Sequence, residues 1–180
     1  MTSETFEIDG LILIKPKVFE DSRGFFVETF HKTRFENLGI NTSFLQDNLS
    51  KSNRGVLRGL HFQKPPFDQG KLIQVIQGSV LDIAVDIRKN SPTYGQHLSI
   101  EINSTNKWQL FIPSGFAHGF LCLEDNTIFS YKCTNLYHKE SEGAIIWNDQ
   151  DLNINWNFEN PIISDKDKVA EKFNQFNSPF

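Results

Sequence analysis

Residues 72–76 (LIQVI), 77–79 (QGS) and 80–87 (VLDIAVDI) decide the fold, because two apolar runs stand on either side of a glycine turn. Short apolar runs bounded by turn residues are typical of β-strands. In the second run the side chains alternate with period two, so one face carries Leu81, Ile83, Val85 and Ile87 and the other carries Val80, Asp82, Ala84 and Asp86. We therefore predict two strands joined by a turn at Gly78.

Further short segments have the same strand-like composition and are separated by turn residues. They are residues 11–19, 24–30, 55–62, 97–102, 109–112, 119–123, 128–134 and 144–147. Many short strands predict an all-β antiparallel sandwich or barrel. Two helices are expected as well. One covers residues 31–38 and ends at Gly39 as a left-handed cap, and the other starts at Ser164. The second helix is predicted from the helical spacing of Val169, Ala170, Phe173 and Phe176.

Composition limits the class of protein. The 180 residues contain no repeat and no low-complexity tract, so we expect a single domain over residues 1–180. A net charge of −4 argues against nucleic-acid binding, which depends on basic surfaces. The longest apolar run is Leu11–Ile14, far shorter than the roughly 20 residues that span a bilayer, so no membrane insertion is expected. Two cysteines and no visible secretory signal favour the cytoplasm.

Residues 55–63 (GVLRGLHFQ) place an arginine and a histidine inside an apolar strand. A buried guanidinium is costly unless it is paired, so Arg58 is expected to meet an anion. A satisfied core histidine is the ordinary interpretation of His61, but the nearby arginine weakens it. Strict alternation would put Arg58 and His61 on opposite faces. If both serve one pocket, the strand must bulge between them, and Gly59 is where a bulge costs least.

Residues 113–119 (PSGFAHG) resemble the second half of the cupin signature, in which a turn delivers a histidine into a barrel. Cupins often use that histidine as a metal ligand, together with an earlier His-x-His pair and a carboxylate. Here the earlier segment offers only His61, and Gln63 stands where the second histidine would be. We therefore expect no metal, and we assign His118 as a polar or cationic group facing an anionic ligand.

Several other polar residues have both a structural and a functional interpretation. Tyr131 is either a packed core residue or a phenol that stays protonated and donates a proton, since its ordinary pKa is about 10. Ser164 is expected to cap a helix, and Asp165 to favour the positive end of its dipole. The structural interpretation is weaker for Asp167. Residues 46–50 (QDNLS) have the composition of a hydrogen-bonded polar loop.

Taken together, these segments resemble the dTDP-4-dehydrorhamnose 3,5-epimerase family, whose members are metal-free and cupin-type. The matching stretches, in the family's order, are residues 21–30, 46–63, 71–95, 109–123, 131–137, 142–149 and 163–167. Residues 168–180 match nothing. The resemblance implies a cupin-like jelly-roll barrel, no cofactor, a dTDP-linked 4-keto-6-deoxy sugar as substrate, and inversion of carbons 3 and 5. It also implies a homodimer with an exchanged N-terminal strand.

The same resemblance implies a role for individual residues. His61 matches the base, Asp167 the acid that orients it, Lys71 the cation beside the ketone oxygen, and Tyr131 the proton donor on the opposite face. The implied substrate-binding residues are Arg23, Glu28, Gln46, Asp47, Asn48, Arg58, His118, Tyr137, Glu142 and Lys166. Among these, Glu28 is a candidate acceptor for the thymine ring N–H, and Tyr137 matches an aromatic residue that stacks on thymine.

Other functions remain open at this point. An enzyme of similar fold that inverts only carbon 3 or only carbon 5 shares much of this residue set. A related keto-isomerase, a metal-dependent cupin enzyme and a non-catalytic nucleotide-sugar binding domain are further alternatives.

Overall fold

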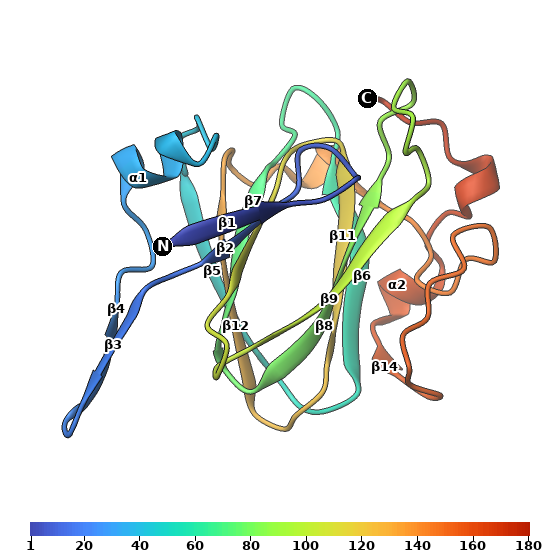
Figure 1. Ribbon diagram of the computed structural model, residues 1–180. Helices are drawn as coiled ribbons and strands as arrows, with labels where there is room; N and C mark the ends of the chain where they lie inside the picture. The colour runs from blue at the N-terminus through green and yellow to red at the C-terminus, as the bar shows by residue number, and fades with distance from the viewer.

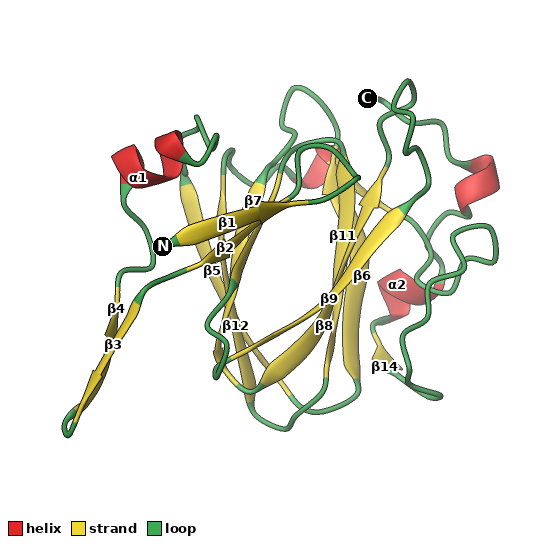
Figure 2. Ribbon diagram, viewed as in Figure 1, coloured by secondary structure: helices red, strands yellow, loops and turns green.

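Two antiparallel sheets face each other in the computed structural model, which describes residues 1–180 (Figure 1). The first sheet has the order β1 (Thr2–Thr5), β2 (Ile12–Lys15), β10 (Gln109–Ile112), β7 (Lys71–Gln77), β12 (Thr127–Cys133) and β5 (Gln46–Ser52). The second has the order β13 (Glu142–Ala144), β6 (Val56–Gln63), β11 (Phe116–Cys122), β8 (Ser79–Asp86) and β9 (His97–Asn103). A short strand, β14 (Ile162–Ile163), pairs with β6 in parallel. Figure 2 shows how few helices accompany these strands, and the all-β jelly-roll prediction is confirmed.

The strands on either side of Gly78 form as predicted but belong to different sheets. β7 pairs with β10 and β12, whereas β8 pairs with β11 and β9. The turn at Gly78, with φ of +81°, therefore carries the chain from one sheet to the other rather than closing a paired hairpin. Side chains of β7 and β8 consequently face each other across the barrel interior.

Both faces of β8 are buried, which explains its nearly continuous apolar character. Val80 and Ala84 belong to the core inside the barrel. Ile83 and Val85 belong to a second core on the outer side, which aromatic side chains of the C-terminal segment cover. A strand with apolar residues on both of its faces is expected where another layer of the protein packs on each face of the sheet.

The two predicted helices differ in how well they match. The first, α1 (Lys32–Asn37), is followed by Gly39 with φ of +89°, as expected. The second, α2 (Asp165–Lys168), is capped by Ser164 but has only four residues. The predicted helical stripe beyond it is wrong, because the Ile146 N–H donates to the Glu171 carbonyl and draws the chain into extended pairing. The chain has two further short helical turns, η1 (Lys139–Ser141) and η2 (Phe173–Gln175).

Strand β5 was expected to be a polar loop, and that prediction is wrong. Its residues alternate between half-buried and exposed, with Gln46, Asn48 and Ser50 pointing inward. A polar strand is stable there because its inner face borders a polar cavity rather than the apolar core. β1 and β14 were not predicted at all. β1 is fully exposed and β14 has two residues, so neither carries a hydrophobic pattern.

One hairpin extends away from the barrel (Figure 1). It consists of β3 (Val18–Asp21) and β4 (Gly24–Val27), which pair only with each other. The side chains of Phe19, Phe25 and Phe26 on it are mostly exposed. The helices are all short, and none has the length and apolar composition of a membrane span.

Candidate active site

Two adjoining cavities of about 290 Å³ and about 260 Å³ lie between the sheets. Both are lined by Asn48, His61, Lys71 and Tyr131, so they form one cleft with these four residues at its centre. The first cavity is also lined by Gln46, Phe62, Gln63, Gln69, Tyr137 and Glu142. The second is also lined by Leu49, Ser50, Arg58, His118, Phe120 and Phe129. The structure thus brings the predicted base, cation and proton donor around the same space.

His61 and Asp167 form a tight pair although 106 positions separate them in the chain. The distance from His61 Nε2 to Asp167 Oδ1 is 2.6 Å, and Asp167 is only 2% exposed. Burial favours the neutral acid, but hydrogen bonds from His61, Ser164 and the Gly59 backbone N–H outweigh it and lower the pKa of Asp167. An ionised Asp167 accepts from Nε2–H, which leaves Nδ1 as the nitrogen of His61 that can take up a proton.

The predicted bulge in β6 is confirmed. Opposite β11, His61 pairs with His118 and Arg58 pairs with Phe120, so two residues of β6 stand against the single Gly119. Gly59 has φ of +143°, a conformation that residues with side chains rarely adopt. This extra residue lets both Arg58 and His61 line the cleft, which strict alternation would forbid.

Arg58 is exposed, so the prediction that it is a buried guanidinium is wrong. Its Nε and Nη2 donate to Ser52 Oγ at 3.3 and 3.2 Å. It forms no ion pair with a carboxylate in the chain. The guanidinium is therefore oriented by a neutral hydroxyl and keeps its charge available for an anion.

Lys71 and Tyr131 have shifted acidities for the same physical reason. Burial lowers the pKa of Lys71, although Cys133, Asp82 and Glu142 oppose the shift. Its Nζ donates to the His61 carbonyl at 3.5 Å, close to the base. Burial raises the pKa of Tyr131, so the phenol stays protonated at neutral pH.

His118 forms a second buried pair, with Asp82. The distance from His118 Nε2 to Asp82 Oδ2 is 2.9 Å, and Oδ1 of that carboxylate is buried without a hydrogen-bond partner. Burial lowers the pKa of His118 more than the carboxylate raises it, so the imidazole enters the cleft neutral rather than cationic. Asp82 is not among the residues predicted for the site. Its carboxylate stands inside an apolar strand, and because a buried charge requires a partner, that position could have indicated a buried ion pair.

Tyr137 and Glu142 form the rim of the first cavity. The Tyr137 backbone N–H donates to Gln46 Oε1 at 2.8 Å, and its hydroxyl donates to Glu142 Oε2 at 3.3 Å. Lys166 forms an ion pair with the other oxygen of Glu142. These contacts join β5, the loop after β12 and the start of α2 at the mouth of the cleft.

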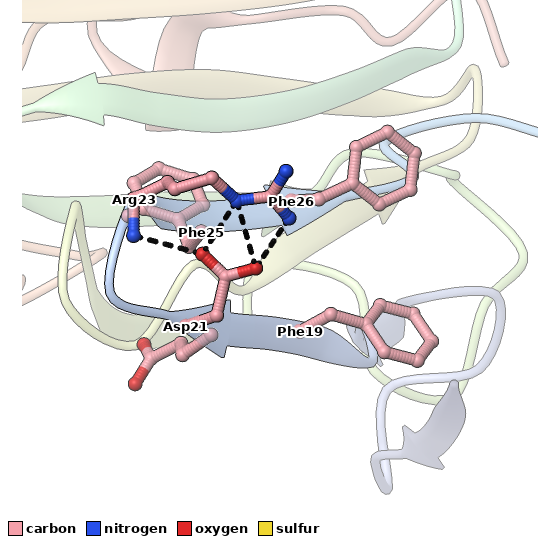
Figure 3. A pocket seen from close by; sticks show the side chains of 7 residues that line it. Phe19, Asp21, Arg23, Phe25 and Phe26 are labelled. Atoms are coloured by element: carbon pink, nitrogen blue, oxygen red, sulfur yellow. Dashed lines mark hydrogen bonds and ion pairs between the residues drawn. The ribbon is translucent and has the colours of Figure 1, made fainter.

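Three predicted binding residues lie outside the cleft of this chain. Glu28 pairs with Arg34 at 2.8 Å, and Asp47 points out of the barrel and pairs with Lys132 at 2.9 Å. Arg23 is 87% exposed at the tip of the β3–β4 hairpin, where it pairs with Asp21 (Figure 3). Asp47 does not line the cleft of this chain, because the period of β5 places it on the outer face.

The side chains considered above as possible metal ligands make other contacts in this structure. No three histidine, cysteine, aspartate or glutamate side chains converge in a metal-binding arrangement. The amide of Gln63, which stands at the position of the second histidine, hydrogen bonds to backbone groups of two loops.

Comparison with known proteins gives the same assignment over almost the whole chain. A family model described as dTDP-4-dehydrorhamnose 3,5-epimerase matches residues 5–175. The dTDP-4-dehydrorhamnose 3,5-epimerase of Shigella flexneri is 50% identical over 168 residues, which cover 93% of each chain. That of Methanothermobacter thermautotrophicus is 51% identical over 164 residues, or 89% of this chain and 88% of the relative.

A solved structure agrees with both. The dTDP-6-deoxy-D-glucose-3,5-epimerase of Legionella pneumophila Philadelphia 1, in complex with dTDP-4-keto-L-rhamnose, has a TM-score of 0.94 at 47% identity. The match covers 98% of this chain and 94% of that one. On the strength of the family model and of these identities, the chain belongs to the dTDP-4-dehydrorhamnose 3,5-epimerase family.

Proposed function

We propose that this protein inverts carbons 3 and 5 of dTDP-4-dehydro-6-deoxy-D-glucose to give dTDP-4-dehydro-L-rhamnose, working as one domain over residues 1–180. One observation carries the proposal. His61, held by Asp167, lines the same cleft as Lys71 and the protonated phenol of Tyr131. Both carbons are adjacent to the ketone, so their protons become acidic when the enolate oxygen is stabilised.

The first step removes a proton from carbon. The C–H electron pair forms the enolate, and the proton passes to Nδ1 of His61, whose other nitrogen is bonded to Asp167. Lys71 lies beside His61 and supplies the positive charge that stabilises the developing oxyanion. Because both the base and the cation belong to the floor of one cleft, neither has to move when charge develops.

The second step returns a proton to the opposite face. Tyr131 gives its phenolic proton to the enolate carbon, and the enolate electron pair forms the new C–H bond. The phenolate then takes a proton from water, and protonated His61 releases one, so that both groups are ready for the second carbon. Two groups on opposite faces are the minimum that inverts a centre through an enolate.

Binding of the nucleotide falls to the remaining side chains of the cleft and its rim. Arg58 supplies a free guanidinium fork for diphosphate oxygens, and the neutral imidazole of His118, whose Nε2 is paired with Asp82, lines the cavity beside it. Gln46, Asn48 and Tyr137 line the end of the cleft at which we place the thymine base, with Glu142 and Lys166 at its edge. Tyr137 stacks on the base in this proposal.

We also propose that the active unit is a cytoplasmic homodimer in which the β3–β4 hairpin brings Arg23 and Glu28 to the partner's cleft. The exposed rings of Phe19, Phe25 and Phe26 support this, because exposed aromatic clusters mark contact surfaces (Figure 3). The two cysteines are unpaired, as in a reducing compartment. The molar mass in solution, measured by light scattering, tests the dimer.

The decisive experiment for the reaction is solvent exchange. Incubation of dTDP-4-dehydro-6-deoxy-D-glucose in deuterated water is expected to place deuterium at both carbon 3 and carbon 5. Exchange at one carbon alone would instead identify a single-centre epimerase of the same fold. Exchange at neither, with dTDP still bound, would leave only a binding domain.

The alkaline side of the pH profile tests the role of Lys71. Lys71 acts when protonated and burial lowers its pKa, whereas Tyr131 acts when protonated and burial raises its pKa. As the pH rises, kcat/KM is therefore expected to fall first through the lowered pKa of Lys71, below the ordinary lysine value of about 10.4. In Lys71→Arg, whose guanidinium keeps its proton, the residual activity should lose this fall. An unchanged alkaline limb in the variant would remove Lys71 from the mechanism.

A further inference from the structure

Gln63 makes an unusual set of hydrogen bonds next to the cleft. It is the last residue of β6, two positions after His61, and is 5% exposed. Its Nε2 donates to the carbonyl oxygens of Phe67 at 2.6 Å and Leu136 at 3.2 Å, and its Oε1 accepts from the His138 backbone N–H at 2.7 Å. One buried amide thus joins two loops that follow different strands, residues 64–70 after β6 and residues 134–138 after β12.

Two of these contacts lie on either side of Tyr137. The amide of Gln63 binds the carbonyl of the residue before Tyr137 and the N–H of the residue after it. The N–H of Tyr137 itself donates to Gln46 Oε1 at 2.8 Å. Two glutamine side chains from two sheets therefore hold one backbone group in each of three consecutive residues, while Tyr137 itself remains 54% exposed at the cavity.

The two loops are tied together by their side chains too. The rings of Phe67 and His138 stack with centroids 3.9 Å apart and planes 7° apart. Gln69 adds a hydrogen bond to the Asn135 carbonyl at 2.7 Å. The contact made by Gln63 differs from these because it alone touches both neighbours of Tyr137.

We propose that Gln63 is a positioning residue that clamps the backbone around Tyr137 and so presents this ring, already oriented, to the base of the nucleotide. The proposal rests on the proposed function only for its ligand, a thymidine diphosphate. A ring whose backbone is held before binding loses little conformational freedom when a base stacks on it. Gln63 touches none of the reacting groups, so its effect is expected in binding rather than in chemistry.

Gln63→Met keeps the length of the side chain and removes all three hydrogen bonds. The Kd for dTDP and the KM for the sugar nucleotide are expected to rise about tenfold, because the backbone around Tyr137 is no longer held by these three bonds and must be ordered when the base binds. The kcat is expected to stay within about threefold. Titration calorimetry with dTDP and steady-state kinetics measure the two quantities separately. A fall in kcat with unchanged KM would contradict the proposal.

A double-mutant cycle with Tyr137→Ala decides whether Gln63 acts through that ring. In the Tyr137→Ala background, Gln63→Met is expected to change the Kd for dTDP by less than about twofold. Equal weakening in both backgrounds would show that Gln63 acts elsewhere and would overturn the proposal. This cycle needs only dTDP binding, so it stands even if the solvent-exchange experiment fails.

A matched control separates the clamp from general loop stability. Gln69→Met removes the amide contact to Asn135, which ties the same two loops without touching a neighbour of Tyr137. It is expected to weaken dTDP binding clearly less than Gln63→Met, and an equal loss would contradict the proposal. If thermal unfolding shows that Gln63→Met does not fold, Gln63→Glu replaces it in the same cycle, since its carboxylate keeps only the contact to the His138 N–H.

Discussion

His61→Asn is expected to lower kcat by about 10³-fold while the Kd for dTDP stays within about threefold. Asparagine keeps a polar side chain near Asp167 but has no nitrogen that accepts a proton. A positioned general base contributes about 10²–10⁴-fold, and His61 has its proton-accepting nitrogen defined by the 2.6 Å bond to Asp167. Since the same residue is used at both carbons, exchange of deuterium is expected to stop at both.

His97→Asn is the matched control for this variant. His97 is a half-buried histidine on β9 and is not among the residues that line the cleft. Its replacement is expected to leave kcat and dTDP binding within about twofold. A large loss of dTDP affinity in His61→Asn would mean that the imidazole mainly binds the nucleotide, and turnover above about a tenth of the wild-type value would exclude it as the base.

Gly59→Ala is expected to destabilise the fold and to disrupt the cleft at once. At φ of +143° a side chain is strained, and an added Cβ would lie 2.5 Å from the Cα of Gly119 on the neighbouring strand. Backbone cannot yield as a flexible side chain does. We expect a loss of at least about 3 kcal/mol in the free energy of unfolding, or a fall in Tm of roughly 6–12 °C.

Gly24→Ala tests whether the close approach, rather than the backbone angle alone, is responsible. Gly24 has φ of +126° at the tip of the β3–β4 hairpin, and nothing lies within 4 Å of an added Cβ. Its cost is expected to be about 1 kcal/mol. Urea unfolding of both variants gives the comparison. If Gly59→Ala is no less stable than Gly24→Ala, the packing of β6 against β11 does not depend on this glycine.

The bulge also shows how far a sequence pattern can lead. Arg58 and His61 stand three positions apart, so period-two geometry separates them, and their joint use required an irregularity that only Gly59 could accommodate. That argument predicted the register shift seen between β6 and β11. It did not predict the exposure of Arg58, because exposure depends on how closely the facing sheet, which contains β5, packs over the side chain.

The polar residues of β5 show the opposite case. Gln46, Asp47 and Asn48 have the composition of a loop, and local propensity gave no reason to expect a strand. Only the paired position beside β12 makes the segment extended. Once it is a strand, alternation turns Gln46 and Asn48 into the cleft and leaves Asp47 outside with Lys132. Which of these residues line the cleft is therefore determined by the tertiary structure and not by the local sequence.

The residue patterns by themselves predicted the all-β class, the glycine at the bulge, and the candidates His61 and Tyr131, because side-chain chemistry and period-two alternation are local. Lys71, and the role of Asp167 as the acid that orients His61, came from the resemblance to a family rather than from a local pattern. The three-dimensional arrangement decided the rest. It paired His61 with a carboxylate 106 positions away in the chain, and it paired a neutral His118 with Asp82. It also gave Gln63, which stands where a second metal-binding histidine would be, hydrogen bonds to the backbone of residues on either side of Tyr137. These contacts depend on which distant segments of the chain meet and on how much water each contact excludes. Both conditions are determined only when the two sheets pack against each other.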